Sequence, residues 1–206
     1  MRVVKFFFGF IFLVSIVKCV DTTPKTLPII GERLGIEPNG DTIYPTVRQF
    51  KFVNQDSITV SDKDFEGKIY ISDFFFTHCP TICPKVTAQM LRLYNTFKDS
   101  TGIKLISFSI DPRHDSVGRL KAYANGLGAL APKWNFVTGN KDTIYALAHD
   151  YFNIATDDKD AAGGITHSGR IVLVDKKRRV RSYCDGTDAK DVDRFMKDVK
   201  ILLIEK

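Results

Sequence analysis

The sequence lacks most of the features that would place it in a specialised class of protein. Only four of its 206 residues are cysteine, and it contains no internal repeat and no low-complexity tract. A repeat architecture is therefore excluded, and disorder is expected only near the termini. The hydrophobic share of 44% and the charged share of 26% are ordinary for a globular protein. Together with the length, they predict one well-buried domain with a short appendage.

A surface stripe of one charge sign is also missing. The formal net charge is +6 at pH 7, but half of this excess comes from Arg2, Lys5 and Lys18, which lie in an N-terminal segment with the features of an export signal. The other Lys and Arg residues are interleaved with Asp and Glu, as between residues 188 and 200. This pattern is typical of a solvated helix face and does not predict a nucleic-acid partner.

The apolar run near the start of the sequence is too short to span a membrane. It covers residues 6–17, whereas a membrane helix needs roughly 20 residues. With basic residues before it, this run predicts a signal that directs export. Cys19 follows where bacterial lipoproteins are cleaved and lipidated, but Lys18 stands where a small residue is expected. Lipidation at Cys19, simple cleavage nearby and retention as an anchor all stay open.

Three parts are expected along the chain. Residues 1–19 form the signal peptide or lipoprotein-type export signal. Residues 20–45 mix Thr, Pro, Gly and charged residues without sustained periodicity, which predicts a linker that sets the domain away from a membrane surface. The folded domain is expected over residues 46–206.

Hydrophobic periodicity predicts an α/β domain. A near-continuous apolar run over residues 69–76 is typical of a central strand that is covered on both faces. The predicted elements are a β-hairpin over 47–60, the strand 69–76, a helix over 86–97, a strand over 103–110, a helix from Val117, a strand over 134–137, a helix opened by Asn140, a hairpin over 171–183 and a last helix over 192–202. This order predicts a thioredoxin-like fold with an added N-terminal β-hairpin, flanking the main sheet, and an inserted helix-strand segment.

Three cysteines remain when Cys19 is set aside, and an odd number in an exported protein argues against a disulfide framework. Cys79 and Cys83 stand where the first parallel strand ends and its helix begins, which is the edge where open α/β sheets build their sites. Cys184 falls in the last predicted hairpin, where we expect it to pack in the interior.

The spacing of Cys79 and Cys83 suits joint chemistry. Four residues of helix place two side chains on one face about one turn apart, with Cβ atoms about 6 Å apart. Both sulfurs can then reach one metal ion, and the same spacing also permits a disulfide. A helix N-terminus lowers the pKa of a thiol, and the thiolate is both the nucleophile and the metal ligand.

The residues around this pair resemble the Sco/SenC family of copper chaperones, which act in cytochrome c oxidase assembly. The resemblance runs from about residue 45 to the C-terminus and rests on residues 77–84, 109–112 and 166–168. The string over residues 73–79 is most similar to bacterial members.

The resemblance implies that Cys79, Cys83 and His167 bind one copper ion. Two thiolates and one imidazole suit Cu(I), and Zn(II) is a chemically competent competitor. His167 precedes the strand that begins at Ile171 and lies in a glycine-rich stretch. We therefore expect a flexible loop to carry it to the cysteines.

Other polar residues near these motifs are given weaker roles. Asp111 ends the second parallel strand at the same sheet edge, so it is expected either to orient a ligand or dock a partner, or to start an Asp-Pro turn. The remaining histidines are expected to be solvated or packing residues, and these are His78, His114 and His149.

Two enzymatic alternatives stay open. Asp73 is an acid inside an apolar strand and should have a raised pKa. Thioredoxins carry a buried acid at the corresponding offset from their first cysteine, so Asp73 favours a thiol-disulfide oxidoreductase. The three residues between the cysteines, where thioredoxins have two, and the presence of His167 argue against it. A thiol peroxidase ranks last, because no Arg adjoins Cys79 and Arg113 or Arg170 would have to be brought near it by the fold.

The leading hypothesis is a metallochaperone, and not a turnover enzyme, that delivers copper as Cu(I), Cu(II) or both to the dinuclear copper site of cytochrome c oxidase subunit II. The resemblance implies a location on the periplasmic side of the bacterial inner membrane, with the N-terminus at the membrane. A Cys79–Cys83 disulfide cannot bind the metal, so a thiol reductant is expected as a partner, beside an upstream copper donor. We expect a monomer.

Overall fold

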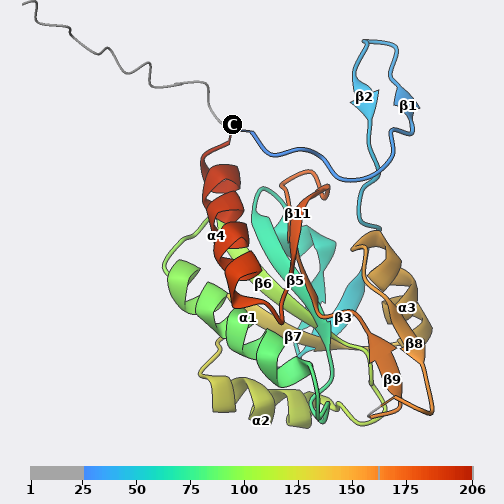
Figure 1. Cartoon of the computed structure of the whole chain (residues 1–206), viewed down its shortest axis with the longest axis vertical. Coiled ribbons are helices and arrows are strands. Elements are labelled where there is room, and N and C mark those ends of the chain that lie inside the picture. Colours follow the sequence, from blue (N-terminus) through green and yellow to red (C-terminus); the bar gives the residue numbers. More distant parts are fainter. Residues whose placement is uncertain (1–25, 162, 206) are drawn as a thin grey trace, which may run out of the picture.

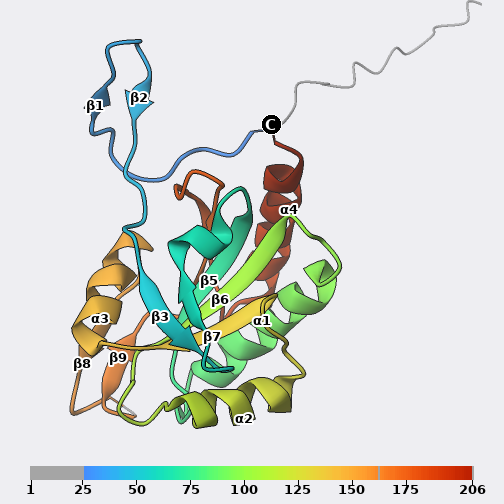
Figure 2. The same ribbon diagram turned by 180° about the vertical axis from the view of Figure 1, so that it is seen from behind.

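The computed structural model describes residues 26–161 and 163–205 (Figure 1, Figure 2). The predicted export signal, with Cys19, lies outside these residues. In the described part of the chain, no helix is both long enough and apolar enough to cross a bilayer.

A seven-stranded mixed sheet forms the centre of the fold, in the order β11-β10-β5-β6-β7-β3-β4. Strands β5, β6 and β7 are parallel to one another, and the outer strands pair antiparallel. All seven residues of β5 are buried, as predicted for a strand that is covered on both faces. The bounds are β3 (Lys51–Asn54), β4 (Thr59–Ser61), β5 (Ile69–Phe75), β6 (Ile103–Ser109), β7 (Trp134–Thr138), β10 (Arg170–Val174) and β11 (Val180–Asp185).

Among the described residues, four α-helices cover this sheet, as predicted, and a short 3-10 helix precedes β5. Helices α1 and α4 lie side by side against one face (Figure 1), and α2 runs beside β7. The predicted apolar stripe of α1 is buried in full, and the side chain of Asn140 caps α3 by accepting from Thr143 N. The bounds are η1 (Asp62–Phe65), α1 (Cys83–Phe97), α2 (Val117–Leu127), α3 (Lys141–Asp150) and α4 (Ala189–Ile204).

Aromatic packing joins both faces of the sheet to the helices. Alternate residues of a strand point to opposite faces. Phe74 packs edge-on against Tyr151 at the end of α3, with ring centroids 5.6 Å apart. Its neighbour Phe75 packs against Tyr123 of α2 at 5.4 Å. The end of β5, from which the site is built, is therefore held rigidly on both faces.

The predicted additions to the thioredoxin-like core are present. The N-terminal hairpin, β3 and β4, pairs with β7 and so forms one edge of the main sheet. The inserted segment supplies α2 and β7.

The predicted linker over residues 20–45 contains structure that the sequence did not indicate. Strands β1 (Gly35–Ile36) and β2 (Thr42–Ile43) pair antiparallel and project away from the body of the domain (Figure 1). Before them, Leu27 is buried and Ile30 N donates to Val180 O on β11. Strands of two residues have no detectable periodicity, so sequence patterning misses them.

A second small hairpin corrects the expectation for His167. Strand β8 (Ala155–Asp157) pairs antiparallel with β9 (Ile165–His167), and Ala155 lies opposite His167. The histidine therefore ends a strand, where a flexible loop was expected. Backbone hydrogen bonds across this hairpin hold its position.

Candidate metal centre

The two cysteines flank the start of α1, but only one of them belongs to it. The helix begins at Cys83, and Cys79 lies in the turn that follows β5, where its backbone N–H donates to Phe76 O. The expectation that both lie on one helix face is thus wrong. A helix that starts at Cys79 would need a backbone hydrogen bond from the N–H of Pro84, and proline has no N–H. Starting at Cys83 places Pro84 in the first turn, where no such bond is required.

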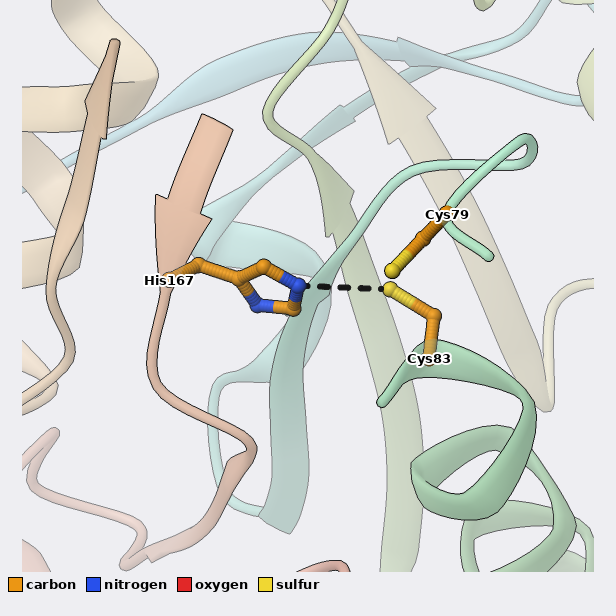
Figure 3. A group of neighbouring side chains, drawn as sticks. All are labelled: Cys79, Cys83 and His167. Carbon is orange, nitrogen blue, oxygen red and sulfur yellow. Dashed lines mark hydrogen bonds between the residues drawn. The ribbon is translucent and has the colours of Figure 1, made fainter. Parts of the chain in front are cut away.

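His167 nevertheless meets both cysteines. Its Nε2 lies 3.4 Å from Cys83 Sγ, and the ligand atoms of Cys79, Cys83 and His167 all lie within 4.8 Å of one another. Figure 3 shows the imidazole reaching across from its strand toward the two sulfurs. Both thiols are free and buried, with 7% of Cys79 and 2% of Cys83 exposed. The fold therefore brings together the three ligands that the sequence suggested.

The two thiols differ in acidity because their surroundings differ. Burial alone would raise the pKa of Cys79, but hydrogen bonds from the backbone N–H groups of Cys83 and Thr81, and from the Thr81 hydroxyl, outweigh it and lower the pKa. Cys83 is more deeply buried, and burial raises its pKa strongly. Cys79 is thus the more acidic thiol of the pair.

His167 is held as a neutral imidazole. Burial lowers the pKa of His167 below its usual 6.5, and its buried Nδ1 finds no hydrogen-bond partner among the described residues. Its ring packs edge-on against Phe76 at 5.6 Å. The loop that contains Gly163 also approaches the ring of Phe76. Gly163 has a φ of +88°, and a Cβ at this position would come within 2.8 Å of Phe76. A neutral imidazole facing two sulfurs is in the state that a metal ligand requires.

Asp73 lies in the buried interior on β5. Burial raises its pKa to about 7, although Ser107 Oγ donates to its carboxylate at 2.5 Å. Trp134 Nε1 donates in turn to Ser107 Oγ at 2.9 Å. The negative charge of Asp73 is also one of the causes that raise the pKa of Cys83. The raised pKa expected from the sequence is confirmed, and the charge of Asp73 acts on Cys83.

A second buried acid, Asp115, was missed by the sequence patterns. It is fully buried and accepts hydrogen bonds from Thr77 N, Thr77 Oγ1 and Ser109 Oγ. Arg119 Nε donates to Thr77 Oγ1 at 2.6 Å and lies 3.8 Å from Asp115. These bonds fix the turn that presents Cys79. An acid just before a helix is usually an exposed N-cap residue, so nothing in the local sequence indicates that Asp115 is buried.

Two further residues lie apart from the three ligands. Asp111 contacts His78 and His114, at 3.5 Å and 2.6 Å, and no contact with the three ligands is found in the described part of the chain. Cys184 is buried on β11, opposite Ile171, in agreement with the expected packing role.

The fold and this site together define a thioredoxin-like domain with two cysteines and one histidine at the carboxyl edge of its parallel strands. The family model described as SCO1/SenC matches residues 40–203. The chain therefore belongs to the SCO1/SenC family, in agreement with the resemblance of its motifs.

Relatives and solved structures support this assignment. A "SCO1 protein homolog" of Bacillus subtilis is 31% identical over 162 residues, which cover 78% of this chain and 84% of that protein. The structure of a SCO1/SenC family lipoprotein from Bacillus anthracis has a TM-score of 0.69 at 29% identity, over 76% of this chain and 94% of that one. The structure of BsSco, a member of the Sco family of cytochrome c oxidase assembly proteins in which a disulfide switch was identified, has a TM-score of 0.70 at 28% identity, over 88% of this chain and 100% of that one.

The similar structures include ones with copper bound. Bradyrhizobium japonicum ScoI with copper bound is 25% identical, with a TM-score of 0.55, over 73% of this chain and 99% of that one.

The difference between the thiols predicts their order of alkylation. At neutral pH, iodoacetamide should modify Cys79 about tenfold or more faster than Cys83, since only the thiolate reacts and Cys83 is both protonated and buried. Peptide mass spectrometry over a time course measures both rates. Faster modification of Cys83 would show that the assignment of the thiolate is reversed.

The raised pKa of Asp73 predicts a pH-dependent stability. The folded state favours the neutral carboxyl. Asp73 therefore makes its full contribution to the stability of the folded state below pH 3.8, and this contribution is lost as the pH rises to about 7. Asp73→Asn should therefore become more stable than the wild type over this range, reaching a difference on the order of 4 kcal/mol. Denaturant unfolding at several pH values tests this, with the exposed Asp99→Asn as the control. A difference that does not vary with pH would contradict it.

Proposed function

We propose that this chain is a copper chaperone that holds one copper ion between Cys79, Cys83 and His167. It delivers this ion to the dinuclear copper site of cytochrome c oxidase subunit II. The observation that carries the proposal is the convergence of two thiols and one imidazole nitrogen within 4.8 Å. The copper-bound ScoI and the oxidase assembly protein BsSco, both similar to this chain, support it.

The chemistry of the three ligands favours Cu(I). Thiolates are soft donors, and an imidazole completes a three-coordinate set that suits this ion. Binding must displace the proton of Cys83, whose pKa is raised, so the affinity should increase with pH. No fourth ligand converges on the site in the described residues. An open position of this kind allows a target ligand to enter and exchange.

Oxidation of the cysteine pair would control copper loading. Forming the Cys79–Cys83 disulfide releases two protons and passes two electrons to an oxidant, such as the disulfide of a partner protein. The oxidised pair has no thiolate left to bind copper. A thiol reductant, and a donor that supplies copper, are therefore parts of the proposal. The proposal also includes export, attachment to the membrane through residues 1–19 and a monomeric state.

A thiol-disulfide oxidoreductase is the second candidate function. Two observations favour it: the lowered pKa of Cys79 and the buried Asp73, whose pKa of about 7 suits proton transfer. His167 is not needed for this reaction. A thiol peroxidase gains no such support, since Arg170 stacks on Tyr183 and no arginine contact to Cys79 is found among the described residues.

Cu(I) titration of the reduced full chain tests the proposal. Competition with a chelator under anaerobic conditions should show one tight equivalent, and His167→Ala and Cys83→Ser should each weaken it by about 100-fold or more, because each removes a ligand.

Cys184→Ser is the matched control, as it removes a buried thiol outside the site. Equal affinity in His167→Ala and the wild type would exclude the three-ligand site. If copper binding fell in His167→Ala while disulfide reduction persisted, the two functions would be separated.

A further inference from the structure

A second group of metal-ligating side chains lies beside the first. His78, Asp111 and His114 each offer one ligand atom, and these atoms lie within 4.8 Å of one another. The group shares no residue with the Cys79, Cys83 and His167 site. Metal binding by this group is therefore independent of the proposed function.

The topology of the sheet brings these three residues together. Strands β5 and β6 are parallel, with Phe75 opposite Ser109 at their carboxyl ends. His78 follows the end of β5, and Asp111 follows the end of β6. The carbonyl oxygen of Asp111 then accepts from the backbone N–H of His114, and this turn places the second imidazole beside the carboxylate.

The carboxylate of Asp111 lacks a permanent positive partner. Only 7% of its side chain is exposed, and its ion-pair partners among the described residues are the two imidazoles, which are charged only when protonated. By contrast, the buried Asp115 has Arg119 at 3.8 Å. A cation bound between the two histidines would neutralise the negative charge of this buried carboxylate.

The ring of His78 is held in place by packing, but its two nitrogens lack good hydrogen-bond partners. Its Nε2 lies 3.5 Å from Asp111 Oδ2, beyond a good hydrogen bond, and its buried Nδ1 finds no partner among the described residues. The ring packs edge-on against Phe76 at 5.0 Å and against His114 at 5.0 Å. Packing, rather than hydrogen bonding, therefore holds its nitrogens near the carboxylate and near His114.

The spacing of the ligand atoms fits an ion between them. Metal–nitrogen and metal–oxygen bonds of about 2.0–2.2 Å put neighbouring ligand atoms about 3.4 Å apart in a tetrahedral site. His78 and Asp111 already stand at 3.5 Å, and His114 has to move outward from 2.6 Å. Its side chain is 58% exposed and is free to do so.

We propose that His78, Asp111 and His114 form a second metal site, for a divalent first-row transition ion. Two imidazoles and one carboxylate are borderline and hard donors, which suit Cu(II) or Zn(II) and not Cu(I). Cu(II) is the strongest binder in the divalent series. Because His78 and His167 both pack against Phe76, this site is the neighbour of the thiolate site. The domain thus offers a nitrogen and oxygen site for a divalent ion beside a sulfur-rich site for Cu(I).

The test uses Cu(II) as the probe, on the full chain carrying Cys79→Ser and Cys83→Ser. These substitutions remove the thiolates, so that Cu(II) is neither bound nor reduced by them. Glycine-buffered titration should show one bound equivalent, and its electron paramagnetic resonance spectrum should show nitrogen coupling. In this background, His114→Gln should weaken binding about tenfold or more, and Asp111→Asn likewise.

His149→Gln, in the same background, is the control and should leave the affinity unchanged, because His149 is exposed on α3. His167→Ala removes a residue of the first site and tells whether Cu(II) binds there instead. Because the His114 side chain is exposed, its replacement is compatible with folding, which thermal melts verify. Absence of a bound equivalent would overturn the proposal. So would binding that His114→Gln leaves intact, or that is lost in His149→Gln or His167→Ala.

Discussion

The start of helix α1 is the constraint on which the site depends. Pro84 has no backbone N–H, so the helix begins at Cys83 and leaves Cys79 in the preceding turn. One thiol is then fixed at a helix N-terminus in the interior, and the other is carried by a turn that Asp115 holds through Thr77. The arrangement differs from two cysteines on one helical turn, but it brings the sulfurs together all the same.

This asymmetry explains the chemistry of the pair. Cys79 receives hydrogen bonds that favour its thiolate, whereas Cys83 is desolvated and lies within reach of the negative field of Asp73. His167 approaches from β9, whose pairing with β8 holds it in place, and burial keeps its imidazole neutral. A metal ion would replace the Cys83 proton and connect the three elements. Copper binding, thiol oxidation and protonation would therefore compete for the same atoms.

The sequence predicted the elements with strong patterns and missed those without them. The buried strand β5 and the apolar stripe of α1 depend on local periodicity, which is visible in the residues themselves. The hairpins β1–β2 and β8–β9 have strands of two or three residues, too short for a pattern. Cys79 and Cys83 were indicated by their place at the end of a predicted strand and by their spacing, and His167 by motifs that resemble a known family. The grouping of His78 with His114 arises from parallel strand pairing and was not visible.

The most direct measurement of the central claim is X-ray absorption at the copper edge of the reduced chain loaded with one equivalent of Cu(I). The account predicts two sulfur ligands at about 2.3 Å and one imidazole nitrogen at about 2.0 Å. A coordination shell of sulfur alone, or one of nitrogen and oxygen alone, would contradict the convergence of Cys79, Cys83 and His167 on a single ion.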